Sequence, residues 1–484
     1  MKSLRIGLAV FALLVYLAFP TKNYYWDGIS FAQNIEDAAR WPQLLHPNHL
    51  IYNLLGWGVY RGFAGKVRAL YILQAMNAVW AAMALYWLSG IVATAVQSSR
   101  AMLLLSALFA FAGTWWRYAE DAGAYIPSIA LLIACAVFLT PGKRPRPVVV
   151  ALLHTAAMLI HQLGLFLFPA ALFALWHQHK EGTPSAIRMR SLALYTGLTG
   201  AITIGAYALG FTALNGSFSV RPFLIWMTSY AEDAAFSFGL FRNAGWSLRS
   251  WGQLFFVGRP SLLRFSDPPT ILLLLLCVSA LILLLLALRR TRFQIRVHQP
   301  SLFRFALLWI LTYALFLFFW LPQNTFYKVF GLPGVVLLVA SCWEPGREPQ
   351  ARGAGTAFVA LLALSNLTLG IIPYSRASSN DIVAFAFSLN QALNPGSVVL
   401  FRNLSTDDWF ARYFNPQSRW QHAGTAGAID AELHAGRPVW LETTAVEHFA
   451  TEDSAWFQDR TRSSEWRELI QPHRRVRFVR LNAP

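Results

Sequence analysis

The polar stretch that decides the fold is WDGISFAQNIE, residues 26–36, and it is followed by HPNH at residues 46–49. It comes shortly after the first apolar run, residues 6–20, which Lys2 and Arg5 precede. The chain is 56% hydrophobic and only 13% charged, whereas an ordinary soluble protein is about 25% charged. In such a chain, the carboxylate of Asp27 marks an acidic group placed at a membrane surface.

The apolar runs identify the chain as an α-helical polytopic membrane protein. Several runs reach the roughly 20 residues that a helix needs to cross a bilayer core, and they are continuous rather than alternating. The net charge is +17. Residues 375–484 contain 12 Arg, no Lys and 12 acidic residues, so the excess lies in residues 1–374. Such charge indicates loops held on the cytoplasmic side, and without a soluble basic domain we expect no nucleic-acid partner.

Three basic loops set the expected topology. Residues 141–147, 180–190 and 289–296 should all face the cytoplasm. The first run lacks a small-x-small cleavage site and is interpreted as an uncleaved span with the N-terminus inside. About eleven spans result, at 6–20, 69–93, 101–117, 122–140, two short helices within 148–176, 191–213, 270–288, 302–320, 326–343 and 355–373.

This topology divides the chain into a transmembrane domain, residues 1–374, and a tail. Residues 21–68 form a first outer loop if the short apolar stretch at 49–60 lies along the surface. A short crossing there is the alternative. Residues 215–268 form a second large outer loop. The localisation expected is the inner (plasma) membrane, multi-pass, with the C-terminal domain extracytoplasmic.

The tail, residues 375–484, is predicted to be a small soluble α/β domain. Strand candidates at 397–401, 438–443 and 475–481 alternate with helical patterns at 381–393, 407–414 and 426–435.

A second acidic site follows the third span in WWRYAEDAGAY, residues 115–125. The topology places its Glu120 and Asp121 on the same face of the membrane as Asp27. Two converging acidic sites could deprotonate an acceptor and hold a cation or a sugar. The alternative is that these are loop charges, solvated or paired with Arg40 or Arg117.

With these pieces in order, the chain resembles the GT-C superfamily of polyprenyl-phosphate-dependent glycosyltransferases. It is most similar to the group of aminoarabinose transferases and protein O-mannosyltransferases. The matching pieces are Asp27 after span 1, His46-Pro47 before a surface helix, Asp121 (or Glu120) after span 3, and Tyr327 with Pro333 in a late span. The resemblance covers residues 1–345. The chain departs from it at Gly28, where the families often have an acidic residue, and in having one proline where they have a pair.

The resemblance implies an inverting transfer of a sugar from a polyprenyl-phosphate donor to an acceptor on the outer face. Asp27 would be the general base, assisted by Asp121 or Glu120. The leaving lipid phosphate would need cations, for which the candidates are Arg117, Arg221, Arg242 and Lys328. The alternative role for any single Arg is contact with phospholipid headgroups. The acceptor, whether glycan, lipid or protein, stays open.

Polar groups near the cavity complete the set of candidates. His46 is expected to bind donor phosphate or acceptor, or to make a hydrogen bond at the helix entry. His161 and Gln162 should lie at the apex of the short helical hairpin, on the cavity floor. His154 and His161 are seven residues apart, and buried hydrogen-bonded histidines are favoured over metal ligands. A divalent metal ion between Asp27 and Asp121 is left open, because no dense ligand motif is present.

A transporter or lipid-handling protein without bond chemistry is the second functional reading. It would use the same cavity, but the sequence lacks the repeat symmetry and matched broken spans that many transporters show. A third reading is an assembly partner that binds through its tail.

Overall fold

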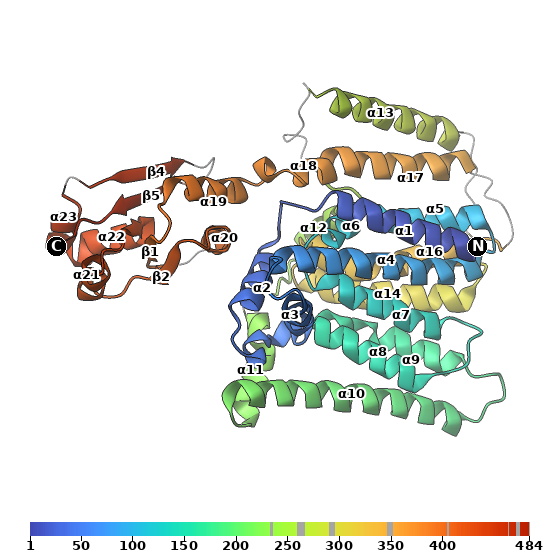
Figure 1. The fold of residues 1–484 in the computed structure, drawn as a ribbon. Helices are drawn as coiled ribbons and strands as arrows, with labels where there is room; N and C mark the ends of the chain where they lie inside the picture. Colours follow the sequence, from blue (N-terminus) through green and yellow to red (C-terminus); the bar gives the residue numbers. More distant parts are fainter. Residues whose placement is uncertain are drawn as a thin grey trace. The chain divides into compact units, whose positions relative to one another are not determined.

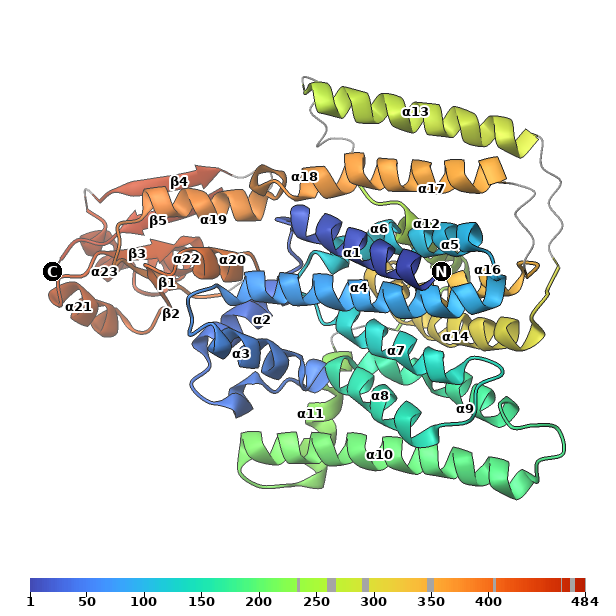
Figure 2. The ribbon, with the colours of Figure 1, turned by 45° about the vertical axis from the view of Figure 1, so that its right-hand side comes forward.

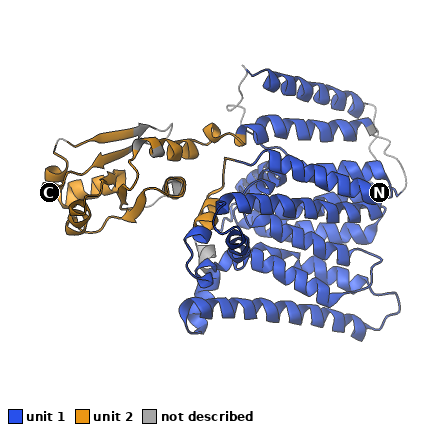
Figure 3. Cartoon of the chain, viewed as in Figure 1, with its two compact units in different colours: residues 1–21, 34–373 blue, residues 22–33, 374–484 orange. Residues whose placement is uncertain are grey.

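The computed structural model describes residues 1–232, 236–258, 267–289, 296–345, 352–403, 406–462, 464–470 and 475–483. These residues form two compact units (Figure 3). The first comprises residues 1–21 and 34–373, and the second comprises residues 22–33 and 374–484. The part of the expected second outer loop at 259–266 lies outside the described residues.

The first unit is a layered assembly of helices that run side by side (Figures 1 and 2). Its long and medium helices are α1 (Lys2–Ala18), α4 (Ala69–Val96), α5 (Ser99–Ala110), α6 (Gly113–Ala119), α7 (Tyr125–Leu139), α8 (Pro147–Ile160), α9 (Phe168–His177), α10 (Ser185–Asn215), α13 (Pro268–Arg289), α14 (Pro300–Phe319), α16 (Leu332–Ser341) and α17 (Arg352–Asn366). Helix α4 packs against α1, α5 and α7, while α7 packs on α8 and α8 on α10. Helices α14 and α16 form a further pair, as do α13 and α17.

Among the described residues, five helical segments are long and apolar enough to cross a bilayer. They are Ala69–Val96, Ser185–Asn215, Pro268–Arg289, Pro300–Phe319 and Gly353–Tyr374. The last is built from α17, a π-helical turn (Leu367–Ile371) and α18 (Ile372–Tyr374). The chain is thus a mostly helical, multi-pass membrane protein. The other expected spans fall on shorter helices, and the count of eleven crossings stays a prediction.

The two short helices expected within 148–176 are present as α8 and α9. They are joined by a 3₁₀ turn at Gln162–Leu167 that folds back on α8. Gly164 allows this reversal, because a Cβ there would lie 3.0 Å from the backbone nitrogen of Met158. His154 Nε2 lies 2.8 Å from the Gly164 carbonyl oxygen, which ties the turn to α8. The predicted meeting point at residues 161–164 is confirmed.

Residues 26–62 form short helices before α4. They are α2 (Trp26–Asp37), the 3₁₀ turns Trp41–Leu44 and Pro47–His49, and α3 (Tyr52–Gly62). The 11 residues of α3 extend about 16 Å, about half of a bilayer core, so α3 is too short to cross. Its Gly56 packs closely, since a Cβ there would meet Ile35 and Leu73 side chains at 2.7 Å. This length supports the prediction of a surface helix at 49–60.

Residues 215–258 contain two further helices, α11 (Val220–Glu232) and α12 (Leu240–Phe255). Helix α11 packs on the turn Pro47–His49, and α12 packs on α6 and on α15 (Thr325–Lys328). The short turn Val329–Gly331 links α15 to α16.

The tail contains a five-stranded sheet in the order β2-β1-β3-β5-β4. Its strands are β1 (Val398–Phe401), β2 (Arg419–His422), β3 (Val439–Glu442), β4 (Trp466–Ile470) and β5 (Arg475–Arg480). Strand β1 pairs in parallel with β2 and β3, whereas β5 is antiparallel to β3 and β4. The strands predicted at 397–401, 438–443 and 475–481 are confirmed, and β2 and β4 were missed.

Both faces of this sheet are buried. Alternate β1 residues point to opposite faces: Val398 and Leu400 join one apolar cluster, and Val399 and Phe401 join another. The tail helices are α19 (Asp381–Ala392), α20 (Thr406–Phe414), α21 (Ala426–His434), α22 (Thr443–Glu452) and α23 (Ser454–Arg460), with a 3₁₀ turn at Ala377–Ser379. The helices predicted at 381–393, 407–414 and 426–435 are confirmed as α19, α20 and α21.

Candidate active site

Asp27 lies in the first turn of α2, in a segment that belongs to the second unit. The backbone N–H groups of Lys22 and Asn23 both donate to the carbonyl oxygen of Tyr374, at 2.7 and 3.2 Å. The ring of Tyr24 lies 5.9 Å from that of Phe414. Asp27 itself is partly exposed. Its place in the first turn of α2 favours the ionised carboxylate through the helix dipole.

Glu120 and Asp121 lie in the first unit, in the loop between α6 and α7, and both side chains are buried. The indole N–H of Trp116 donates to Glu120 Oε1 at 2.5 Å. Burial raises the pKa of Glu120 well above its usual range, and the charge of Asp121 adds to this. This shift favours the protonated form of Glu120, so Asp121 is the better candidate for an ionised second acid.

Two amide side chains of α4 hold this acidic loop in place. Gln74 Nε2 donates to the carbonyl oxygens of Thr21 and Glu120, at 2.9 and 2.8 Å. Asn77 Nδ2 donates to those of Asp121 and Gly123, both at 2.7 Å. Both side chains are buried in an otherwise apolar helix. Neither residue was predicted from the sequence. Two amides three residues apart on one face of a candidate span could have indicated a buried polar site.

A cluster of histidine and tyrosine rings lies in the same unit. The His161 ring is 4.7 Å from that of His49, 5.0 Å from Tyr125 and 6.3 Å from Tyr327, measured between centroids. His46 stacks on His49 at 5.7 Å. The structure thus brings the predicted residues His46, His161 and Tyr327 together. It adds Tyr125, the first residue of α7, while Tyr327 lies within α15.

The histidines of this cluster that precede α3 are neutral. Burial lowers the pKa of His46 and lowers that of His49 well below its usual range. His46 Nδ1 accepts a hydrogen bond from the Asn48 N–H at 3.2 Å. A neutral imidazole offers one donor and one acceptor, so these rings suit hydroxyl groups better than they suit a full charge.

Comparison with solved structures identifies the fold. The chain is similar to the ArnT structure from Cupriavidus metallidurans bound to undecaprenyl phosphate, at 13% identity and a TM-score of 0.59. The alignment covers 99% of this chain and 97% of that one. The chain has the GT-C glycosyltransferase fold. This confirms the resemblance seen in residues 1–345 and extends the similarity of fold into the tail.

Two other solved structures align less closely. The ArnT structure from C. metallidurans in the apo state has 13% identity and a TM-score of 0.44, over 99% of this chain and 97% of that chain. The oligosaccharyltransferase from Archaeoglobus fulgidus, tethered to an acceptor peptide, has 10% identity and a TM-score of 0.40, over 94% and 70%. No protein-family model matches the chain, and no curated protein matches it by sequence.

Two of the predicted binding residues make contacts within this GT-C fold that occupy their polar groups. Lys328 is buried, and its ammonium group donates to Ser250 Oγ and to the carbonyl oxygens of Pro322 and Asn324. Three acceptors use all three of its N–H donors. Gln162 donates to the carbonyl oxygens of Pro47 and Met227, at 3.0 and 3.2 Å. Both residues fix loops around the site rather than presenting free donors to a substrate.

The predicted arginines are better placed for an anion. Arg221 on α11 is exposed, and Arg117 on α6 is partly buried with its guanidinium 5.8 Å from the centre of the Tyr118 ring. Arg242 is exposed, donates to Ser237 Oγ at 2.7 Å and lies over the Trp246 ring. Arg117 and Arg221 are therefore better candidates than Lys328 to bind a phosphate.

The described residues provide no fitting donor set for a metal ion, since they contain no group of three or more His, Cys, Asp or Glu side chains that could hold one. Both ring nitrogens of His154 have hydrogen-bond partners, which are the Tyr195 hydroxyl at 2.7 Å and the Gly164 carbonyl. The preference for a buried, hydrogen-bonded His154 is confirmed. No step below runs through a metal. Whether Asp27 and Asp121 act as a pair stays a prediction, because they belong to different units.

Proposed function

We propose that this protein is a membrane glycosyltransferase that moves a sugar from a polyprenyl-phosphate donor to an acceptor on the extracytoplasmic face. The observation that carries the proposal is the likeness of fold, over 99% of the chain, to an ArnT structure bound to undecaprenyl phosphate. The chain also has acidic residues after its first and third apolar runs, in the order that the resemblance requires.

Asp27 is the general base of this reaction. It takes the proton of an acceptor hydroxyl or amine as that atom attacks the anomeric carbon. The bond from this carbon to the phosphate oxygen breaks at the same time, so the configuration inverts and polyprenyl phosphate leaves. Asp121 orients the sugar or the acceptor through hydrogen bonds. Glu120, whose burial favours its protonated form, is a donor or a structural residue and not a base.

The leaving phosphate needs charge stabilisation more than it needs a proton. Arg117 and Arg221 are the first candidates to supply it, because an arginine fork matches phosphate oxygens. The cluster of His46, His49, His161, Tyr125 and Tyr327 offers uncharged donors, acceptors and ring faces to the sugar. His161 Nε2 is buried without a protein partner among the described residues, which favours a ligand for this ring.

The test is an assay for released polyprenyl phosphate with the purified full-length protein and a panel of polyprenyl-phosphate sugars. We expect turnover by the wild type and a loss of about 10²–10⁴-fold in Asp27→Asn. Asp37→Asn is the matched control, because Asp37 lies in the last turn of the same helix and is exposed.

Two results would overturn the proposal. The first is that no donor of a broad panel is turned over by a monodisperse wild-type protein. The second is that Asp27→Asn and Asp37→Asn are equally active, which would remove Asp27 from the mechanism while leaving the transferase activity intact.

A further inference from the structure

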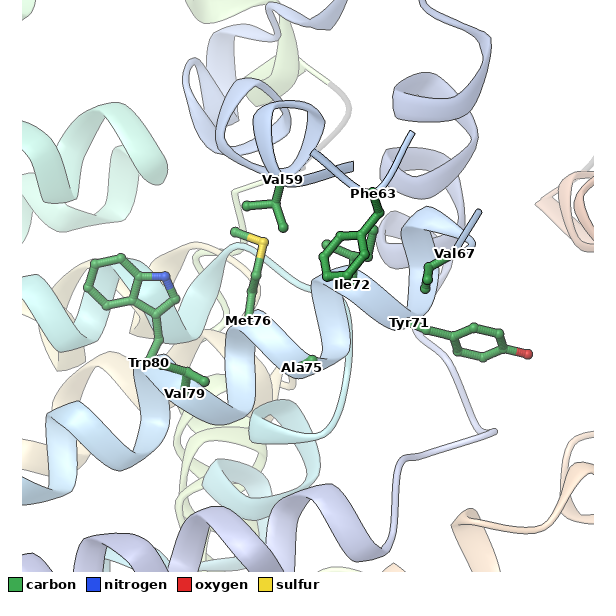
Figure 4. A pocket seen from close by; sticks show the side chains of 9 residues that line it. All are labelled: Val59, Phe63, Val67, Tyr71, Ile72, Ala75, Met76, Val79 and Trp80. Atoms are coloured by element: carbon green, nitrogen blue, oxygen red, sulfur yellow. The ribbon is translucent and has the colours of Figure 1, made fainter. Parts of the chain in front are cut away.

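An apolar groove opens between α3 and α4 in the first unit (Figure 4). Its volume is about 370 Å³. Val59, Phe63 and Val67 line it from α3 and the turn that follows, and Tyr71, Ala75 and Trp80 are among the residues that line it from α4. This face of α4 points away from Gln74 and Asn77, which hold the acidic loop, so the groove is separate from the candidate active site.

The groove has the depth of one membrane leaflet. It follows α4 from Tyr71 to Trp80, a rise of about 14 Å, while the bilayer core is about 30 Å thick. Tyr71 lies in the first turn of a helix long and apolar enough to cross the membrane. The groove therefore starts near one end of the candidate span and stops close to the depth of the bilayer midplane. A single acyl chain needs this length, whereas a polyprenyl chain is much longer.

Two exposed cations lie close in the sequence to residues that line one end of the groove. Arg61 and Lys66 are exposed and flank Phe63 and Val67 in the sequence. The Arg61 guanidinium lies 5.4 Å from the centre of the Trp57 ring, while Arg68 forms an ion pair with Glu36 at 2.9 Å. The sequence contains no Asp or Glu between Asp37 and Glu120. Two exposed cations thus adjoin an apolar groove at the end of a span, where lipid phosphates lie.

We propose that this groove binds one anionic phospholipid, with an acyl chain against α4 and the headgroup phosphate on Arg61 and Lys66. The complementarity is twofold: the groove matches one leaflet in depth, and residues next to its lining in the sequence carry charge opposite to that of the headgroup. This occupant would also account for Arg61 and Lys66 on the extracytoplasmic side, where the positive-inside rule disfavours basic residues. The inference does not depend on glycosyl transfer.

Native mass spectrometry of the full-length protein, released from nanodiscs with equal phosphatidylglycerol and phosphatidylcholine, tests this site. For the wild type we expect one retained lipid and a preference for phosphatidylglycerol on the order of tenfold. The double variant Arg61→Gln/Lys66→Gln should retain lipid without that preference. Ala75→Trp should fill the groove and lose both lipids. Val59→Phe fills the groove from α3 and is the second groove-filling variant, to be used if Ala75→Trp does not fold.

Matched controls lie elsewhere on the first unit. Lys143→Gln/Arg144→Gln removes two exposed charges from another loop, and Leu152→Trp enlarges an exposed apolar residue of α8. Both should behave as the wild type. The proposal fails if the Arg61/Lys66 variant keeps its headgroup preference or if both groove-filling variants keep their lipid. It also fails if undecaprenyl phosphate displaces the phospholipid one for one from the wild type, because the groove would then hold the donor chain.

Discussion

At the scale of single residues, the structure separates two neighbouring acids that the sequence could not rank. We expect Glu120→Gln to keep transfer within a few-fold of wild type, because burial favours the protonated form of Glu120, which glutamine resembles in shape and charge. Asp121→Asn should reduce transfer by about 10²-fold or more, the range for a group that acts in proton transfer or charge stabilisation. The measurement is turnover of a polyprenyl-phosphate sugar at saturating donor.

The same two variants must be compared for stability. Both should melt within a few degrees of wild type, since each replacement keeps the size of the side chain. If Glu120→Gln were the inactive variant and Asp121→Asn the active one, the roles assigned to the two acids would be reversed.

The stability of the folded protein should depend on pH because of His49. Its pKa is lowered by burial first, and then by the neighbouring His161 and His46, so the unfolded chain takes up a proton near pH 6.5 that the folded chain does not. Stability is therefore full above pH 6.5 and falls as the pH drops below it, by up to about 1.4 kcal/mol per pH unit for each such histidine.

The melting temperature in detergent should accordingly decrease between pH 7 and pH 5. In His49→Asn this decrease should be smaller, while His434→Gln, a change at an exposed histidine of the tail, should follow the wild type. Equal slopes in all three proteins would show that His49 does not carry the effect.

At the scale of elements, α4 positions the acidic loop of the candidate site. Asn77→Leu keeps the volume of the side chain but deprives the carbonyl groups of Asp121 and Gly123 of their donor. Each buried carbonyl left unsatisfied costs about 1–3 kcal/mol. We expect a loss of roughly 2–4 kcal/mol in stability and a lower kcat, because the carboxylate of Asp121 is no longer held.

The comparison for Asn77→Leu is Thr94→Val on the same helix. Thr94 is exposed, and its hydroxyl donates at 3.0 Å to the Gly90 carbonyl, one turn earlier. Its removal should change stability by less than about 0.5 kcal/mol. Two variants of equal stability and activity would mean that the amide of Asn77 does not position the loop.

Elements of this fold were predictable from the sequence where one physical signal dominates. Continuous apolar runs located the long helices, and the paired basic loops required a reversal that the structure places at His161 and Gly164. Strands β2 and β4 were missed because Arg419–His422 is short and mostly polar, and Trp466–Ile470 is short and interrupted by the charged pair Arg467 and Glu468. The sequence could not show that three oxygen atoms accept all the hydrogen bonds of the Lys328 ammonium group, since one of them belongs to Ser250, 78 positions away.

At the scale of the whole molecule, the segment that carries Asp27 depends on the tail. Phe414→Leu should weaken the contact between the rings of Tyr24 and Phe414, raise hydrogen exchange in residues 22–33 and reduce transfer several-fold. Phe449→Leu is the control. It changes a buried ring in the apolar cluster that contains Val398 and Leu400, so it should destabilise the tail by a similar amount without exposing residues 22–33.

This dependence could not be read from the sequence. The helix at Trp26–Asp37 was not predicted, and the grouping of residues 22–33 with residues 374–484 rests on hydrogen bonds and ring contacts between residues far apart in the sequence. If Phe414→Leu left both exchange and transfer unchanged, the tail would be irrelevant to the position of Asp27.

The link between Lys22 and Tyr374 also sets an order of events during synthesis. The ribosome completes the Asp27 segment early, but the carbonyl group that anchors it is made about 350 residues later. At roughly 5–20 residues per second, this is a delay on the order of a minute. A nascent chain with most of its membrane helices already made would thus still have its proposed base unanchored until Tyr374 has been synthesised.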